Sequence, residues 1–422
     1  MGTAALRVWL HRRQRPLRYR LLRELLATQA LSREALAEKQ RRDLAAIIAF
    51  ARENTAYYAK RLRLCADWRI EALPILTKDD VRAHLPELLV RGHDPATTPI
   101  GHTGGSTGQP LAFYYDDFKH ELMRAGMMRS YLLSGWRPGQ KILNFWGARQ
   151  DTVKGGVFGS AAWDDFIAAE KTLPAHEIDA AKLAFWADFI CRYRPALLQG
   201  YASILALLAR FVLDEKRSMP DCLIGVYSTA EMLSDEMRET IEAAFGCKVF
   251  NQYGSREIPN IACECRHGNM HIFTDMVWLE SIDGQLIVTS LTNRLMPMIR
   301  YAIGDCGELL DGECSCGLPF PLLAMGVCRH NDLIRTPDGG RLHPSFFNRL
   351  LYGLTQIRQY QFEQDAPDRL RLHLAADEPL SAKTVAHLRA EIAAVGLALS
   401  IDYVPEIART ISGKQRFVIR AI

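Results

Sequence analysis

The 422-residue sequence has little net charge and no hydrophobic run long enough to cross a membrane. Its formal charge of +4 is small for this length and gives no reason to expect a nucleic-acid partner, since such a protein would show a concentrated basic face. A membrane-spanning helix needs roughly 20 consecutive apolar residues, and the sequence has no transmembrane segment of that kind. It also lacks the apolar stretch and cleavage site of a signal peptide. We therefore expect a cytoplasmic protein.

The cysteines do not indicate a disulfide framework. Ten are present, and in a chain expected to be cytoplasmic such cysteines are reduced core residues or metal ligands. The composition is 48% hydrophobic and 24% charged, which is typical of folded globular proteins. The chain is too long for one compact core and predicts two or three domains.

The most distinctive stretch, His102–Pro110, is rich in glycine and hydroxyl side chains. It lacks the Gly-Lys-Ser/Thr ending of a Walker loop, and no helical pattern follows it directly. Apolar runs at Leu88–Val90 and Leu111–Tyr115 predict strands on both sides. A loop of this kind can surround an anion with backbone N–H groups, but an ordinary glycine-rich turn has the same composition. Taken alone, the stretch leaves both interpretations open.

Residues 1–60 form a helical extension rich in leucine and arginine. We expect two helices, the second beginning after Ser32. Two interpretations fit the leucines that recur at helical spacing among arginines. The helix lies on a membrane surface with a basic polar face, or it packs its leucines on the main domain while the arginines stay in solvent. We favour the second. Thr77 is predicted to cap a further helix.

Strands and helices alternate through the middle of the chain, which predicts a largely parallel α/β core. Polar and aromatic residues follow several of the strands, where parallel sheets place ligand groups. The expected helices are 117–134, 175–193, 203–215 and 234–245, and the expected strands are 141–147, 196–201, 223–231 and 248–254.

The pattern changes to short strands at about residue 270, which predicts a β-rich subdomain appended to the α/β core. The expected strands are Met270–Phe273, Trp278–Ile282, Gln285–Ser290, Met298–Tyr301 and Glu308–Leu310, with a hairpin turn at Asp283-Gly284. The last ninety or so residues predict helix, strand, strand, helix and strand. The fold class is therefore α/β, with a large domain over 1–328 and a small α+β domain over 329–422.

Five motifs occur in the order and spacing of the adenylate-forming superfamily, which includes acyl-CoA ligases. They are His102–Pro110, Tyr253–Glu257, Tyr301–Asp305, Arg329–Asp332 and Ser412–Lys414. Within that superfamily, the run Leu295–Tyr301, the short chain and the Cys-Ser-Cys-Gly sequence resemble the phenylacetate–CoA ligase branch, which contains CapK-type proteins. The resemblance covers residues 50–422.

The resemblance implies an ATP-dependent ligase that activates a carboxylic acid. Such enzymes form an acyl-adenylate and pyrophosphate from the acid and MgATP, and usually pass the acyl group to a thiol of CoA or a carrier protein. It also implies that the C-terminal domain is mobile and swings over bound ATP. The acid pocket would lie at the strand ends, around Trp146, Gly147, Tyr201 and Tyr227. The three aromatic residues favour an aromatic or otherwise flat apolar acid, but aromatic side chains near strand ends are equally typical of a core.

The resemblance also implies which residues bind the nucleotide. The loop residues Thr103, Gly104, Gly105, Ser106, Thr107 and Gly108 would hold the β- and γ-phosphates. Tyr253, followed by Gly254 and Ser255, would lie on the adenine face, with Ser228, Ala230 and Glu231 lining its edge. Asp305 would accept hydrogen bonds from the ribose hydroxyls, and Arg329 would reach the ribose or a phosphate.

Three residues are implied in catalysis. Glu257 would bind Mg²⁺, and Lys414 would bridge the reacting carboxylate and the α-phosphate. Arg256 stands where many relatives have a Ser or Thr that contacts the α-phosphate. Cys328 replaces a glycine before the hinge arginine, and the loop 338–341 differs from the one that contacts CoA in acyl-CoA ligases. The acceptor therefore stays open among CoA, a carrier-protein thiol, an amine and a hydroxyl, and a non-catalytic zinc-containing homologue is the alternative from another class.

Two cysteine-rich segments, 263–268 and 314–317, predict a structural zinc site. Thiolate and imidazole ligands suit tetrahedral Zn²⁺, and relatives in this branch carry a metal at such a place. We expect Cys265, His267, Cys314 and Cys316 as ligands, with Cys263 or His271 as substitutes. The alternative is a set of reduced cysteines in loops.

Overall fold

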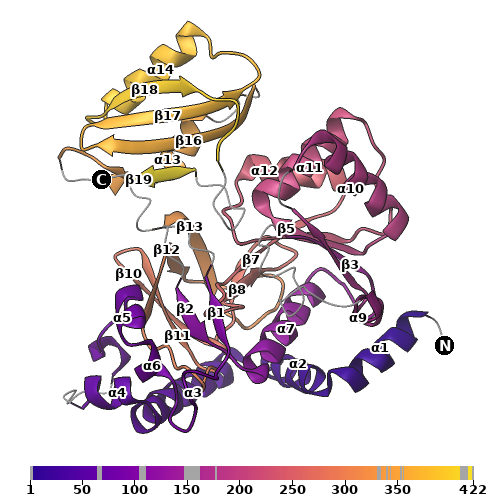
Figure 1. The fold of residues 1–422 in the computed structure, drawn as a ribbon, viewed down its shortest axis with the longest axis vertical. Coiled ribbons are helices and arrows are strands. Elements are labelled where there is room, and N and C mark those ends of the chain that lie inside the picture. The colour runs from indigo at the N-terminus through magenta and orange to yellow at the C-terminus, as the bar shows by residue number, and fades with distance from the viewer. Residues whose placement is uncertain are drawn as a thin grey trace.

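The computed structural model describes residues 3–63, 69–103, 111–146, 162–175, 178–329, 334–338, 341–342, 344–351, 354, 356–408 and 417–420. Helices of the N-terminal extension run along one side of the large domain, which is built on a large central sheet, and a smaller α/β unit follows at the C-terminus (Figure 1). In the described part of the chain, no helix is both long and apolar enough to cross a membrane.

The extension forms three long helices, α1 (Thr3–Gln14), α2 (Pro16–Gln29) and α3 (Arg33–Asn54), where two were expected. Pro16 is the first residue of α2 and separates it from α1, because proline fits the first helical turn but not a helix interior. Ser32 caps α3 as predicted, its hydroxyl accepting a hydrogen bond from the Ala35 amide. Leu21, Leu22 and Leu25 of α2 are buried, and this helix packs against α7 (Asp117–Leu132). The packing interpretation therefore holds for α2.

One sheet of eleven strands runs through the large domain, in the order β10-β11-β12-β13-β9-β8-β7-β6-β5-β3-β4. Its second half is parallel, as predicted, and the crossover helices pack on it. The unpredicted strand β4 precedes α10, which begins later than expected. The elements of this half are β3 (Ile142–Trp146), α9 (Ala162–Ala168), β4 (Glu170–Pro174), α10 (Ala180–Tyr193), β5 (Leu197–Tyr201), α11 (Ala202–Asp214), β6 (Gly225–Thr229), α12 (Asp235–Phe245) and β7 (Val249–Tyr253).

The β-rich segment continues this same sheet instead of forming an appended subdomain. The antiparallel pair of β7 and β8 joins the two halves. The strand expected at 298–301 was wrong, because β12 begins only at Tyr301 and Arg300 before it has a positive φ of 48°. The strand expected at 308–310 is confirmed as the end of β12, which is longer than predicted. Asp283 and Gly284 both have positive φ, as the predicted hairpin turn requires. The strands are β8 (Ala262–Glu264), β9 (Met270–Ile272), β10 (Val277–Ile282), β11 (Gln285–Ser290), β12 (Tyr301–Leu310) and β13 (Leu322–Arg329).

The glycine-rich stretch joins two short antiparallel strands, β1 (Ile100–His102) and β2 (Ala112–Tyr114). The strand after the stretch was predicted, but the one expected at Leu88–Val90 was wrong, since Leu88 ends helix α6 (Leu85–Leu88). Helix α5 (Lys78–Ala83) begins at a capping box in which Thr77 and Asp80 satisfy each other's amides, as predicted for Thr77. Helix α4 (Ala56–Arg61) and the turn η1 (Ile70–Ala72) complete this region.

The C-terminal unit has its own four-stranded sheet, in the order β18-β17-β16-β19, and its own core around Phe347, Phe362 and Leu372. The predicted order of helix, strand, strand, helix and strand is confirmed. In Figure 1 this unit, in yellow, lies beyond the end of β13. Its elements are β14 (Ile334–Arg335), β15 (Arg341–Leu342), α13 (Pro344–Leu351), β16 (Ile357–Ala366), β17 (Arg369–Ala376), α14 (Ala382–Ala393), β18 (Ala398–Tyr403) and β19 (Val418–Arg420).

Candidate active site

The segments 253–257 and 301–305 lie side by side and are joined at both ends. The Tyr253 hydroxyl lies 3.1 Å from Oδ2 of Asp305, and the Tyr301 hydroxyl lies 3.0 Å from Oε1 of Glu257. The first residue of each segment thus contacts the last residue of the other. Tyr253 ends β7 and Tyr301 begins β12, so two strands of the central sheet hold the aromatic and acidic side chains of two separate motifs together.

Glu257 is buried, with 4% of its surface exposed. One carboxylate oxygen accepts the Tyr301 hydroxyl, whereas Oε2 has no hydrogen-bond partner among the residues that the structure describes. A buried carboxylate oxygen without a partner is costly. An oxygen ligand of this kind fits a hard cation such as Mg²⁺.

Lys119, in the first turn of α7, is a residue of this site that sequence reasoning missed. It lines the same cavity as Glu257, and its ammonium lies 4.3 Å from the centre of the Phe113 ring in β2. Burial lowers the pKa of Lys119 to about 8, although the negative charges of Glu257 and Asp116 oppose the shift. No signal in the sequence distinguishes this lysine from one on a solvent-facing helix surface.

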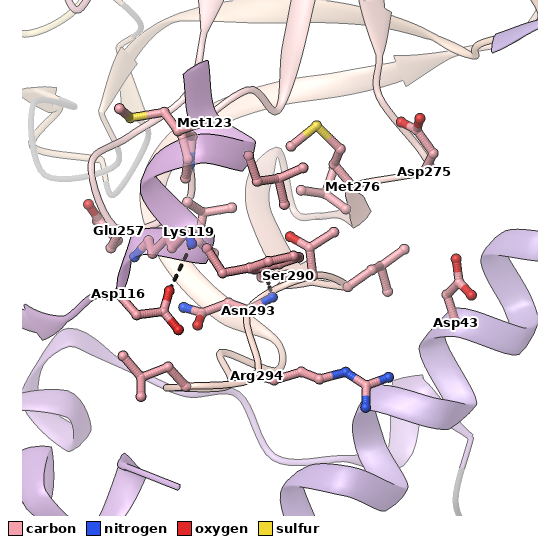
Figure 2. Close-up of a pocket in the computed structure, with 18 of the residues that line it drawn as sticks. Asp43, Asp116, Lys119, Met123, Glu257, Asp275, Met276, Ser290, Asn293 and Arg294 are labelled. Carbon is pink, nitrogen blue, oxygen red and sulfur yellow. Dashed lines mark hydrogen bonds between the residues drawn. The ribbon is translucent and has the colours of Figure 1, made fainter. Parts of the chain in front are cut away.

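The cavity beside Glu257 has a volume of about 590 Å³. Glu257, Lys119 and Asp116 gather at one end of it, while Asp43 lies at the other (Figure 2). Asp116 caps α7 by accepting a hydrogen bond from the Lys119 amide. None of the described residues expected to bind the acid or the adenine edge (Trp146, Tyr201, Tyr227, Ser228, Ala230 and Glu231) lines this cavity.

Arg256 connects this region to the base of the glycine-rich hairpin. Its guanidinium Nη1 donates to the carbonyl oxygen of His102 at 2.6 Å. Thr103 closes the hairpin, because its amide donates to the Leu111 carbonyl and its hydroxyl accepts from the Leu111 amide, both at 2.9 Å. The structure thus places the start of the predicted phosphate loop beside Arg256. Gly104, Gly105, Ser106, Thr107 and Gly108 lie outside the described residues.

The turn after β7 depends on its small residues. A Cβ on Gly254 would lie 2.8 Å from the Asn260 amide nitrogen, closer than such contacts allow. The Ser255 hydroxyl accepts a hydrogen bond from the Ile258 amide at 3.1 Å. This turn sets the positions of Arg256 and Glu257, which lie between those two residues.

The segment after β6, predicted to line the adenine edge, is held by its own contacts. Ser228 is fully buried, and its hydroxyl has no hydrogen-bond partner in the described part of the chain. Ala230 has a φ of 68°, a strained conformation for a residue with a side chain, of the kind that concentrates at functional sites. Glu231 accepts a hydrogen bond from the Ser203 amide at 2.9 Å, so its carboxylate also fixes the start of α11.

Of the aromatic residues predicted to bind the acid, Tyr227 lies in the core. It is fully buried, stacks on Phe250 and donates its hydroxyl to the Ser130 carbonyl at 2.7 Å. Trp146 is partly buried, and its ring meets that of Tyr201 edge-on at 4.9 Å. Tyr201 is 2% exposed. The prediction was therefore wrong for Tyr227. This residue lies at the centre of the buried strand β6 and not at its end, so its ring packs in the core.

The remaining predicted residues are Arg329, Gly147 and Lys414. Arg329 is the last residue of β13, and its backbone is in register with that of Asp305 on β12. Gly147 and Lys414 lie outside the described residues.

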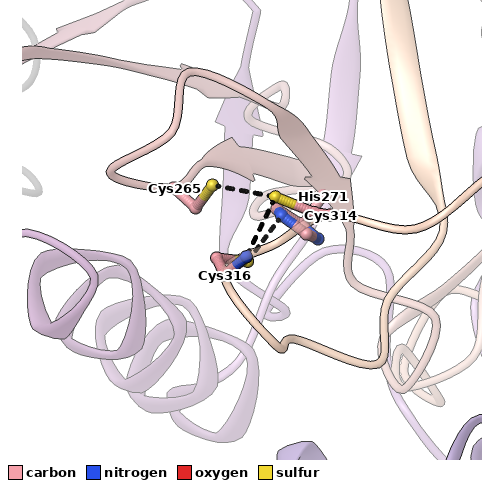
Figure 3. A group of neighbouring side chains, drawn as sticks. All are labelled: Cys265, His271, Cys314 and Cys316. Carbon is pink, nitrogen blue, oxygen red and sulfur yellow. Dashed lines mark hydrogen bonds between the residues drawn. The ribbon is translucent and has the colours of Figure 1, made fainter.

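A second candidate site lies where the β8–β9 hairpin meets the loop between β12 and β13. There, Cys265, His271, Cys314 and Cys316 form a tight group (Figure 3). Their possible ligand atoms all lie within 4.8 Å of one another. The prediction of His267 as the histidine was wrong, since His271, named as a substitute, occupies that place and the His267 ring contacts the Ser315 hydroxyl instead. Cys263 is buried in the main hydrophobic core.

The geometry of this group fits zinc. Cys265 Sγ and Cys314 Sγ are 3.6 Å apart, and two thiolates on one tetrahedral zinc ion, each bound at about 2.3 Å, lie roughly 3.8 Å apart. The His271 Nδ1 faces the Phe320 carbonyl at 3.3 Å while Nε2 faces Cys316 Sγ, which is how a carbonyl orients a metal-binding imidazole. Burial would raise the pKa of the Cys314 thiol, but hydrogen bonds from the Cys316 and Asn269 nitrogens outweigh it and lower that pKa.

The chain resembles known proteins over most of its length. Residues 334–421 match the family described as the CapK C-terminal domain. The chain is 25% identical to protein CapK of Staphylococcus aureus, over 84% of this chain and 80% of that one. It is also 25% identical to the phenylacetate–coenzyme A ligase of Thermus thermophilus, over 83% of this chain and 84% of that one.

A solved structure shares the fold. The 2-hydroxyisobutyryl-CoA ligase, captured in a postadenylation state with an acyl-adenylate, superimposes with a TM-score of 0.73 at 18% identity, covering 93% of this chain and 91% of that one. The sequence relatives and the C-terminal family agree with this fold. The chain is therefore similar over most of its length to CapK and to the phenylacetate–coenzyme A ligases, matches the CapK C-terminal domain at residues 334–421, and shares the fold of an acyl-CoA ligase.

Proposed function

We propose that this chain is an AMP-forming ligase that adenylates an organic carboxylic acid and transfers the acyl group to a thiol such as that of CoA. The observation that carries the proposal is the pairing of Tyr253 with Asp305 and of Tyr301 with Glu257. This pairing assembles a ribose acceptor, an aromatic platform and a candidate metal ligand from two motifs that lie far apart in sequence. The chain's similarity to phenylacetate–coenzyme A ligases supports the reaction class.

In this proposal, ATP binds across the ends of β6 and β7 and over β12. The ring of Tyr253 stacks on the adenine, and Asp305 accepts hydrogen bonds from the ribose hydroxyls. The glycine-rich hairpin surrounds the β- and γ-phosphates, and Arg256 lies at its base. From there the forked guanidinium of Arg256 reaches the α-phosphate, which relatives contact with a neutral Ser or Thr.

Glu257 is the residue that would hold Mg²⁺, through the oxygen that the Tyr301 hydroxyl leaves without a partner. Bound Mg²⁺ would neutralise phosphate charge and so favour attack on the α-phosphorus. Lys119 supplies a further positive charge in the same cavity and stabilises the Glu257 carboxylate electrostatically. Tyr301 orients that carboxylate.

Lys414 completes the site in this proposal. It arrives with residues 329–422, which act as a mobile domain hinged near Arg329. Its ammonium bridges the acid's carboxylate and the α-phosphate, and so removes the repulsion between nucleophile and electrophile. The carboxylate oxygen forms the new bond to the α-phosphorus as the bond to the pyrophosphate oxygen breaks.

Cys265, His271, Cys314 and Cys316 would hold a structural Zn²⁺. Four protein ligands leave no open position for substrate, so the metal would stabilise the fold without taking part in the reaction. It would tie the β8–β9 hairpin to the loop before β13.

Pyrophosphate release with a panel of carboxylic acids, aromatic and aliphatic, tests the proposal. We expect release that depends on one class of acid, and CoA thioester when CoA is then added. An adenylate that accumulates without consuming CoA would assign the acceptor to a carrier-protein thiol, an amine or a hydroxyl. If the chain binds ATP but none of the acids causes pyrophosphate release, the proposal is contradicted and a non-catalytic homologue is favoured.

A further inference from the structure

One side of helix α1 packs on the body of the protein. Gly139 lies in the loop between α7 and β3. A Cβ on this residue would lie 2.7 Å from the Ala4 carbonyl oxygen and 2.9 Å from a Val8 methyl. The loop therefore touches the side of α1 that carries Ala4 and Val8. His11, one turn further along that side, is buried and contacts the Tyr19 hydroxyl at 3.0 Å. Residues at this spacing share one helix face.

The opposite side of α1 is apolar and basic. Leu6 and Trp9 are 41% and 42% exposed. Leu6, Trp9 and Arg13 follow one another at steps of three and four residues, so they share one face of the helix. The Arg13 guanidinium lies 3.9 Å from the centre of the Trp9 ring. In α2, by contrast, Leu21, Leu22 and Leu25 are buried. The burial that explains the leucines of α2 therefore does not extend to this face of α1.

Helix α9 adds exposed aromatic rings next to this face. It packs beside α1, and the Gln14 side chain donates to Asp164 at 2.6 Å. Trp163 is 63% exposed and stacks on Phe166, over which the Arg7 guanidinium lies at 4.7 Å. We call Leu6, Trp9, Trp163 and Phe166, with the arginines of α1, the α1–α9 patch.

Positive charge is concentrated in the segment that forms α1 and α2. Residues 3–29 contain seven arginines and one glutamate, whereas the net charge of the whole chain is +4, so the rest of the chain is slightly acidic. Arg18 is buried and pairs with Glu121 at 2.9 Å. Five others are exposed: Arg12 and Arg13 on α1, Arg15 between the two helices, and Arg20 and Arg23 on α2. Arg15 also lies 3.6 Å from Glu121, and Arg20 lies 3.8 Å from Glu24.

We propose that the α1–α9 patch docks on the surface of an anionic lipid bilayer. Tryptophan and leucine enter the headgroup region while arginines bind lipid phosphates, which is the way amphipathic basic helices attach to membranes without spanning them. The positive charge favours a bilayer over a protein partner with an apolar surface. Such a partner would account for the exposed rings but not for the nearby arginines. Helix α1 projects from the body at the N-terminal end of the chain (Figure 1), where a flat surface can reach it.

Sedimentation of the full chain with vesicles tests this. One set contains equal parts of phosphatidylglycerol and phosphatidylcholine, and the other contains phosphatidylcholine alone. We expect binding to the anionic vesicles that weakens as salt is added, and little binding to the neutral ones. The double variant Arg12→Glu/Arg13→Glu should lower the partition coefficient at least about tenfold, and Trp9→Ala/Trp163→Ala should lower it severalfold.

Matched controls carry the same changes elsewhere. Phe185→Ala removes a ring that is 48% exposed on α10, and Arg389→Glu reverses an exposed charge on α14; both should bind as the unchanged protein does. Equal binding by the patch variants and the controls would overturn the proposal, as would absence of binding to anionic vesicles. A dimer in solution that Trp9→Ala/Trp163→Ala converts to monomer, without vesicle binding, would overturn it in favour of a subunit interface. Acid-dependent pyrophosphate release is unaffected by the patch variants, so the outcome is independent of the proposed enzymatic activity.

Discussion

The Tyr301 hydroxyl lies 3.0 Å from Oε1 of Glu257, and the same carboxylate's Oε2 has no hydrogen-bond partner among the described residues. A hydrogen bond to one oxygen fixes the plane of the carboxylate and so sets the direction of the other. Because Tyr301 begins β12 and Glu257 follows β7, the orientation of the candidate metal ligand depends on strands from both halves of the central sheet.

Tyr301→Phe should therefore weaken the use of Mg²⁺ without abolishing the fold. Loss of one buried hydrogen bond costs about 1 kcal/mol of stability. We expect the Mg²⁺ concentration for half-maximal pyrophosphate release to rise several-fold, and Glu257→Gln, which removes the charge, to have a much larger effect. An unchanged Mg²⁺ dependence in Tyr301→Phe, with Glu257→Gln inactive, would show that Tyr301 does not position the carboxylate.

Asp305 and Tyr253 share one hydrogen bond but should differ in their effect on ATP. Asp305→Asn removes the charged acceptor proposed for the ribose hydroxyls, and hydrogen bonds to a charged group contribute about 1.5–3 kcal/mol. We expect at least a tenfold rise in the KM for ATP. Tyr253→Phe keeps the ring that stacks on adenine and should change that KM only slightly. Equal effects of the two changes would contradict the separate roles.

The order of the motifs could be predicted from sequence, but the contacts between them could not. Tyr253, Glu257 and Asp305 were identified as candidates because each belongs to a motif. That Tyr301 orients Glu257 depends on β12 lying beside the end of β7, which is a property of the sheet order. Lys119 and the Arg129–Asp275 ion pair, which joins α7 to the segment after β9 in the core, were missed for the same reason.

The local sequence does not contain enough information to predict the short strands or to choose the zinc-binding histidine. Strand β8 has three residues and β4 has three charged or polar positions among five, so neither shows a clear strand pattern. His267 and His271 both follow Cys265 closely, and spacing alone allows either. The β8–β9 pairing decides between them, because it aligns His271 with Cys263 on the neighbouring strand and leaves His267 in the turn.

The two histidines provide a matched test of the zinc site. The purified chain should contain about one zinc ion, measured by elemental analysis. His271→Ala and Cys316→Ser should lose the metal and lower the melting temperature, because a structural zinc ion contributes directly to folding stability. His267→Ala and Cys191→Ser, whose residues are exposed, should keep it. Zinc retained by His271→Ala and lost by His267→Ala would contradict the assignment.

His11, at the junction of α1 and α2, should make stability depend on pH. Burial and the charges of Arg18 and Arg124 lower its pKa to about 4 from the ordinary 6.5. Between those values the unfolded chain binds a proton that the folded chain does not, so stability falls as the pH drops below 6.5. We expect this residue to account for about 2 kcal/mol of the loss between about pH 7.5 and about pH 5.

Urea unfolding of the unchanged protein and of His11→Gln measures this effect. The variant removes the titrating group, so the stability difference between the two proteins should change over that pH range. Other histidines, including His120, titrate in both proteins and cancel in the comparison. A difference that stays constant between the two pH values would show that His11 does not carry the dependence.

Acid-dependent exchange of pyrophosphate into ATP by the unchanged protein and by Lys414→Ala is the most direct test of the proposed activity. Lys383→Ala, which removes an exposed lysine of the same C-terminal unit, serves as the control. We predict exchange with the unchanged protein and with Lys383→Ala, and a loss of at least about a hundredfold with Lys414→Ala, while ATP binding is retained. Full exchange by Lys414→Ala, or no exchange by the unchanged protein with any acid, would contradict the account.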